Sequence, residues 1–320
     1  MKPLLTILFF VFFTANILFP QENQYGPGYR TILMNNPAIS GASGESMLRL
    51  SYLNFYPGNS YNLHSFYLSF DSYVEALHGG AGLWLSDDYL GGIINDTRGG
   101  ISYAYSLRAG KDIFINAGLS AGIFHRGYNT SDAVLPDMID PLGGVIYPSG
   151  ESPFLSSGAL LDISAGFLLM YNKFFAGFSI IHLSQPDMAS GMQKENLRRK
   201  LFLNAAWDIS LAGDNSVSIR PAAFMEFQKD RVSLACGSSL EFKNFAINLL
   251  LSENTEKSLD IQTGFSVKTG PIGIFYSYRF NVMSENVYLP FSLLHQAGLT
   301  FGLNSVNKRN ALKAITLPEL

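Results

Sequence analysis

Residues 113–123, which read IFINAGLSAGI, show most clearly how this chain folds. Ile113, Ile115 and Ala117 alternate with Phe114 and Asn116, and the alternation continues to residue 123. A period of two residues places the two sets on opposite faces of an extended chain and is typical of a β-strand, not of a helix. A tilted strand of about 10 residues is long enough to cross a bilayer.

The same alternation recurs along the chain and predicts fourteen strands. They are expected at residues 46–55, 61–71, 79–88, 98–108, 112–124, 158–170, 172–182, 199–211, 214–228, 230–241, 243–252, 258–268, 271–281 and 291–304. Single-chain bacterial outer-membrane barrels have an even number of antiparallel strands. We therefore predict an all-β fold, a transmembrane antiparallel β-barrel of the outer-membrane type, over residues 46–304.

Charged residues are sparse, at 15% of the chain, and they avoid the apolar face of the strands. A Lys or Arg that faces lipid at mid-bilayer costs about 2–4 kcal/mol, so the apolar face is expected to contact lipid and the polar face to line the lumen. The lumen-facing polar set comprises Asp162, Asp208, Arg220, Asp260 and Arg279. These side chains either pair across the barrel interior for structural reasons or line a polar channel.

Glycines are also frequent at lumen-facing positions. The set comprises Gly118, Gly122, Gly166, Gly177, Gly237, Gly264 and Gly298. Glycine in a strand permits curvature and leaves room for another segment to approach closely.

The two ends of the chain lie outside the predicted barrel. Residues 1–20 are expected to be a signal peptide, because Lys2 precedes an apolar run that is short for a membrane span. Residues 21–45 are predicted to form a periplasmic N-terminal segment and residues 305–320 a periplasmic tail.

Long and short connections alternate between the predicted strands. Long loops are expected at residues 89–97, 125–157, 183–198 and 282–290, with Asp87 and Asp88 at a strand end that turns into the first of them. Outer-membrane barrels have short periplasmic turns and long extracellular loops. The pattern therefore places both termini in the periplasm.

No motif in the chain indicates catalysis. The five histidines lack zinc-ligand spacing, Cys236 is the single cysteine, and no G-x-S-x-G or P-loop occurs. Asp132, Asp137 and Asp140 could bind calcium through oxygen ligands, but their spacing is not that of an EF-hand. We expect no catalytic residue, no metal site and no cofactor, and a net charge of −3 argues against nucleic-acid binding.

The residues before the first strand contain a distinctive Asn36-Pro37-Ala38 sequence. Pro37 disfavours the helical conformation at Asn36, and Gly41 permits a tight bend. The segment is expected either to cap the lower rim of the barrel or to fold into the lumen and seal it.

Several short segments, in their order along the chain, resemble the PorP/SprF family of type IX secretion and gliding-associated proteins of Bacteroidota. The resemblance rests on Asn36 to Gly41, on residues 68–71 (LSFD), 80–88, 102–107 (SYAYSL) and 174–183 (FFAGFSIIHL). The positions that match the family motifs are Tyr29, Asn36, Pro37, Ala38, Gly41, Phe70, Asp71, Tyr103, Tyr105, Gly177 and His182.

The resemblance implies a non-enzymatic barrel of the bacterial outer membrane that supports the export or surface attachment of secreted proteins. Its implied partners are the C-terminal domain of a secreted protein or a surface adhesin, other components of the secretion machine, and outer-membrane lipid. The sequence does not decide whether the chain is a core component of the secretion machine or an adhesin-linked paralogue. The alternative is an outer-membrane channel or transporter for small hydrophobic solutes.

Overall fold

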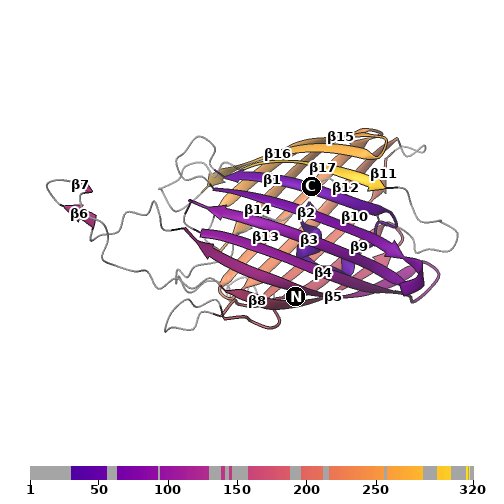
Figure 1. Cartoon of the computed structure of the whole chain (residues 1–320). Helices are drawn as coiled ribbons and strands as arrows, with labels where there is room; N and C mark the ends of the chain where they lie inside the picture. Colours follow the sequence, from indigo (N-terminus) through magenta and orange to yellow (C-terminus); the bar gives the residue numbers. More distant parts are fainter. Residues whose placement is uncertain are drawn as a thin grey trace, which may run out of the picture.

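A closed antiparallel β-barrel forms almost the whole of the computed structural model (Figure 1). The structure describes residues 30–55, 63–92, 94–129, 138–140, 144–145, 158–187, 196–211, 216–255, 258–283, 294–303, 315 and 317. The wall consists of β1 (Ser46–Phe55), β2 (Leu63–Val74), β3 (Gly79–Leu90), β4 (Ile94–Arg108), β5 (Ile113–Tyr128), β8 (Ala159–Tyr171), β9 (Phe174–Ile181), β10 (Lys200–Trp207) with its continuation β11 (Ile209–Ser210), β12 (Val217–Gln228), β13 (Arg231–Phe242), β14 (Phe245–Asn254), β15 (Leu259–Thr269), β16 (Ile272–Met283) and β17 (Leu294–Leu303). Each strand pairs with its neighbours along the chain, and the pairing of β1 with β17 closes the barrel. The predicted fold and all fourteen predicted strands are confirmed.

The two faces of the wall differ as the alternation predicts. Ile101, on the outward face of β4, is 69% exposed, whereas Asn116, on the inward face of β5, is fully buried. The outward face presents a nearly continuous band of Leu, Ile, Phe and Tyr side chains. This band matches the lipid-facing belt of an outer-membrane barrel.

One predicted loop is wrong. Residues 89–97 were expected to form a long loop, but β3 continues to Leu90 and β4 begins at Ile94. Gly91 and Gly92 make the tight turn with φ angles of 65° and 82°, which glycine adopts readily. Because β3 is longer than expected, Asp88 lies inside the strand and not at its end.

The two ends of the barrel are unlike each other. At one end, here called the short-turn end, neighbouring strands are joined by residues 75–78, 109–112, 172–173, 243–244 and 270–271. The 3-10 helix η2 (Glu75–Leu77) lies in the first of these turns. The opposite end, the long-loop end, carries the connections 129–158, 182–199 and 284–293, and the small strand pair β6 (Ile139–Asp140) and β7 (Gly144–Val145) lies in the first of them. β1 begins and β17 ends at the short-turn end.

No helix among the described residues is long and apolar enough to cross a membrane.

Arginine in place of Leu249 is expected to impair assembly far more than arginine in place of Leu303. Both side chains point outward and are similarly exposed, at 51% and 52%, but Leu249 lies in the middle of β14 and Leu303 at the last residue of β17. The cost of an outward arginine falls from about 2–4 kcal/mol at the bilayer midplane to about 0–1 kcal/mol near the interface. The yield of the heat-modifiable folded form measures the effect, and equal yields of the two variants would contradict the position of the lipid-facing belt.

Candidate functional site: a plugged barrel lumen

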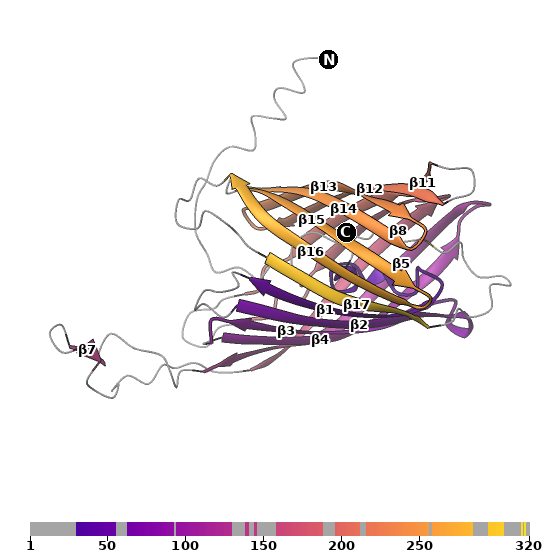
Figure 2. The ribbon, with the colours of Figure 1, turned by 90° about the horizontal axis from the view of Figure 1, so that it is seen from above.

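A segment from the N-terminal part of the chain occupies the barrel lumen. This segment, here called the plug, comprises residues 30–45 and contains α2 (Ile32–Asn35) and η1 (Pro37–Ile39). Figure 2 shows the two short helices between the near and far walls of the barrel. The Asn36-Pro37-Ala38 segment was expected either to cap the lower rim of the barrel or to fold into the lumen, and it lies in the lumen. The periplasmic assignment of residues 21–45 stays a prediction.

The local sequence explains the path of the plug. Asn36 is extended, with φ −145° and ψ 104°, as the following proline favours. Its side-chain oxygen accepts a hydrogen bond from the Ala38 backbone N–H at 3.0 Å and caps η1, while Pro37 occupies the first helical position. Gly41 has a φ of 68° and turns the chain back toward β1, so the predicted conformations at Asn36 and Gly41 are confirmed.

Hydrogen bonds from six strands of the wall (β2, β4, β5, β8, β9 and β10) hold the plug. Asn116 on β5 donates to the Ala38 carbonyl at 3.1 Å, and Asp71 on β2 accepts the Gly41 N–H at 2.8 Å. The remaining contacts join Ser40 to Ser102 at 2.7 Å, the Lys200 ammonium to the Asn35 side chain at 3.3 Å, the Ser179 hydroxyl to the Asn35 carbonyl, and the Asn36 amide to the Phe167 carbonyl at 3.4 Å. The plug is therefore fixed by polar groups from one side of the barrel wall, from β2 to β10.

Glycines on the inner wall leave the space that the plug fills. A Cβ atom at Gly118 would overlap the Ala38 backbone, one at Gly166 the Asn36 side chain, and one at Gly80 the Ser40 carbonyl. At Gly177 it would lie 2.7 Å from the Asn36 amide nitrogen. The expected role of lumen glycines is confirmed for Gly118, Gly166 and Gly177, whereas Gly122, Gly237, Gly264 and Gly298 approach neighbouring strands.

An apolar core forms between the plug and the wall. Ile32, Ala38 and Ile39 of the plug are buried in it. The wall contributes inward-facing side chains, among them Phe114, Leu168, Phe175, Phe202, Phe224 and Leu250. Burial of apolar surface drives packing, so these positions make the plug an integral part of the folded barrel.

Ion pairs buried at the inner wall surround the plug. Arg49 on β1 pairs with Asp71 on β2, next to the N–H of Gly41. Toward the long-loop end, Arg98 pairs with Asp88 at 3.1 Å, and Arg126 makes two hydrogen bonds of 2.7 Å to Asp96. Buried charges of this kind are stable only when they are paired and hydrogen-bonded.

The predicted lumen-facing polar residues make their described hydrogen bonds and ion pairs with neighbouring elements of the wall. Arg220 contacts Asp208 at 3.4 Å and pairs also with Glu241. The His182 ring nitrogen Nδ1 donates a hydrogen bond to the Asp162 carboxylate at 2.7 Å. In β15 and β16, Asp260 accepts from Asn281 at 2.7 Å, and Arg279 donates to Gln262 at 2.7 Å. These contacts join neighbouring elements, which favours a structural role.

The remaining family-motif positions fall into two groups. Phe70, Tyr103 and Tyr105 face outward, and the Tyr103 hydroxyl donates to the Leu77 carbonyl at 2.6 Å across the short-turn end. His182 is buried directly after β9 and has a φ of 60°. Tyr29 lies outside the described residues.

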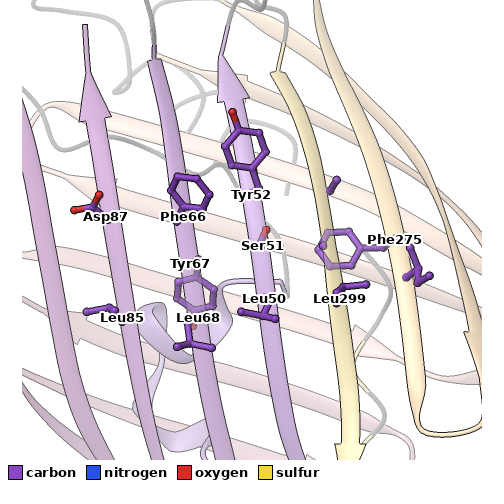
Figure 3. A pocket seen from close by; sticks show the side chains of 13 residues that line it. Leu50, Ser51, Tyr52, Phe66, Tyr67, Leu68, Leu85, Asp87, Phe275 and Leu299 are labelled. Atoms are coloured by element: carbon purple, nitrogen blue, oxygen red, sulfur yellow. The ribbon is translucent and has the colours of Figure 1, made fainter. Parts of the chain in front are cut away.

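An apolar hollow lies on the outside of the barrel. This groove of about 450 Å³ is lined by Leu50, Tyr52, Phe66, Leu85, Asp87, Ile274 and Leu299, among others, across β16, β17, β1, β2 and β3 (Figure 3). Its lining consists mainly of lipid-facing apolar side chains. It is therefore a feature of the membrane-facing surface and not a path through the lumen.

Within the described ranges, no group of three or more His, Cys, Asp or Glu residues could hold a metal ion. Asp132, Asp137 and the side chain of Asp140, considered for calcium, lie outside those ranges.

Comparison with known proteins identifies both the family and the fold. The family model for the type IX secretion system membrane protein PorP/SprF matches residues 18–294. No curated protein matches the chain. Among solved structures, a TodX deltaS2S3 mutant monoaromatic hydrocarbon channel has a TM-score of 0.51 at 11% identity and covers 87% of this chain and 99% of its own.

The CymD monoaromatic hydrocarbon channel has a TM-score of 0.50 at 11% identity, covering 88% of this chain and 95% of its own. The outer membrane protein Omp33 of Acinetobacter baumannii has a TM-score of 0.47 at 9% identity, covering 82% and 100%. At such identities the likeness concerns the fold alone.

Proposed function

The chain belongs to the PorP/SprF family of type IX secretion system membrane proteins, and from that membership we propose that it is a sealed scaffold in the outer membrane. On this proposal it conducts no solute, catalyses no reaction and supports export or surface attachment of secreted proteins. It does so by binding their C-terminal domains or other secretion-machine components. Residues 1–20 act as the export signal, and the short-turn end faces the periplasm, as in other outer-membrane barrels.

The observation that carries this proposal is the plug. Its backbone and side chains bond to the wall on one side, and its apolar residues complete a core with Phe202, Phe224 and Leu250 on the other. A porin keeps a polar, water-filled lumen, whereas this lumen contains a packed apolar core. A barrel filled in this way is suited to holding a partner at the membrane without leaking solutes.

The long-loop end is the expected contact surface for a secreted partner. Its connections 129–158, 182–199 and 284–293 are far longer than the turns at the other end. Binding residues are concentrated in loops that a rigid scaffold holds in place. The barrel supplies that scaffold, and the proposed contacts are protein-protein contacts outside the membrane.

The alternative function is a channel for small hydrophobic solutes; TodX and CymD are monoaromatic hydrocarbon channels. That function requires the plug to move or the lumen to open beside it. A variant in which the plug is locked to the wall therefore distinguishes the two functions.

A disulfide between the plug and β4 provides the test. The hydroxyl oxygens of Ser40 and Ser102 are 2.7 Å apart, so Ser40→Cys and Ser102→Cys bring two thiols together, in a Cys236→Ser background. We expect the oxidised protein to support secretion and surface retention of a cognate secreted protein as well as the reduced protein does. Loss of secretion on oxidation, restored by reductant, would contradict the sealed scaffold, because it would show that the plug must move for the protein to work.

The matched experiment removes residues 132–152 from the long loop and leaves the barrel intact. Surface retention of the secreted protein is expected to be abolished, while the heat-modifiable barrel still forms. Normal retention in this loop variant would contradict partner binding at the long-loop end.

A further inference from the structure

The end of the chain also reaches into the barrel. Ile315 is 6% exposed and belongs to the apolar core that contains Ile32, Ile39 and Ala42 of the plug. Its backbone N–H donates a hydrogen bond to the Ala42 carbonyl at 3.1 Å. Leu317 packs against the same core. The range 305–320 was expected to be a periplasmic tail, and these two described residues of it lie against the plug.

The contact is located at the short-turn end. Ala42 follows Gly41, whose N–H binds Asp71 near the end of β2, and it lies just before the first residue of β1, Ser46. Ser46 pairs with Leu303, the last residue of β17, so the plug enters the wall beside the point where the wall ends. The chain from Leu303 to Ile315 can span about 40 Å when extended, which is ample for the return to Ala42.

Ile315 is buried in the apolar core that contains plug residues, Leu317 packs against the same core, and the Ile315 backbone N–H bonds to the plug. Apolar side chains in one seat together with a backbone hydrogen bond are a common way for a peptide segment to dock. Here the seat is formed by the plug and by the wall side chains that pack against it. The hydrogen bond to Ala42 fixes the register of the peptide.

We propose that Ile315 and Leu317 form an intramolecular latch that holds the plug in the lumen from the short-turn end. The latch binds Ala42, the last buried plug residue before β1, so that any withdrawal of the plug through this end must first displace the C-terminal segment. This role concerns the plug alone and is independent of what the barrel binds at its long-loop end.

Labelling of a buried cysteine tests the latch in the full chain. Ala42→Cys in a Cys236→Ser background places a thiol under Ile315, and a maleimide-polyethylene glycol reagent reports its exposure. We expect a chain that ends at Ala314 to be labelled at least about tenfold faster than the full-length chain, because local opening of the site no longer requires release of the latch. A chain that ends at Pro318 keeps both anchors and is the matched control, with labelling as slow as in the full-length chain.

Three further measurements distinguish loss of the latch from a folding defect. Heat-modifiable migration checks that the shortened barrel is closed, and Ile315→Ala in the full-length chain is expected to increase labelling where Leu303→Ala does not. A synthetic peptide of residues 312–320, LKAITLPEL, is expected to restore protection to the shortened chain, whereas the same peptide with Ile315→Asp is not. Equal labelling rates in the full-length chain, the chain ending at Ala314 and the Ile315→Ala variant would overturn the latch.

Discussion

Replacement of Asp71 by alanine is expected to lower the free energy of unfolding by about 3–5 kcal/mol, because it leaves the buried Arg49 guanidinium without its counter-charge. The same change removes the acceptor for the Gly41 N–H, at 2.8 Å, and so weakens the turn by which the plug joins β1. Asp71 is thus one of the points at which the wall and the plug are held together. Denaturant unfolding of the purified protein in detergent measures the loss.

Asp208→Ala is the matched control for this prediction. Asp208 is partly exposed, and its partner Arg220 pairs also with Glu241, so the guanidinium keeps a counter-charge. We expect a loss of about 1 kcal/mol or less, as for exposed ion pairs. Equal effects of the two substitutions would show that the Arg49–Asp71 contact has no special role.

Leucine in place of Gly118 is expected to expel the plug while the barrel remains folded. The new Cβ would overlap the Ala38 backbone, and a backbone segment cannot bend aside locally as the end of a flexible side chain could, so the plug as a whole must shift. Overpacking of a well-filled site costs about 1–3 kcal/mol, and a clash with backbone atoms lies at or above the upper end of that range. The plug is the part that can move without breaking the ladder of strand pairs.

The exposure of a cysteine at Ser40 measures this displacement in a Cys236→Ser background. The Gly118→Leu variant should be labelled roughly tenfold faster or more, since local openings expose buried sites according to their free energy. Ala117→Leu adds the same side chain one residue away on the outward, exposed face of β5 and should leave labelling unchanged. Slow labelling of the Ser40→Cys thiol in the Gly118→Leu variant would contradict the conclusion that Gly118 leaves the space that the plug fills.

The barrel could be predicted because the alternation of apolar and polar residues is visible within each strand by itself. Ile113 to Ile123 shows both faces of a strand within one segment, and the sparing use of charge identifies the lipid-facing side without knowledge of the partners. The extended Asn36 and the turn at Gly41 were predictable for the same reason. The glycines at Gly118, Gly166 and Gly177 already indicated that a segment could be inserted.

The contents of the lumen were harder to predict, because they depend on contacts between distant parts of the chain. Asp96 falls inside the wall only because β4 begins earlier than its pattern indicated. Arg98 is the first residue of the predicted strand, but its partner Asp88 and the Asp96–Arg126 ion pair were not predicted. The apolar part of the inner wall, on which the plug packs, could have been recognised from the sequence. Phe114, Leu168, Phe175, Phe202, Phe224 and Leu250 all occupy the face that otherwise carries polar residues.

The position of Ile315 had no such signal. Nothing in a short apolar peptide after the last strand indicates that it returns to the start of the first strand, because the contact joins Ala42 and Ile315 across almost the whole chain.

Single-channel recording in a planar lipid bilayer tests closure of the lumen most directly. The intact protein, purified with its plug, is expected to show no conductance steps on the scale of a porin. The Gly118→Leu variant, which has the same barrel without a seat for the plug, is expected to show them, while Ala117→Leu stays closed. Porin-like conductance in the intact protein, unchanged by Gly118→Leu, would contradict a sealed barrel.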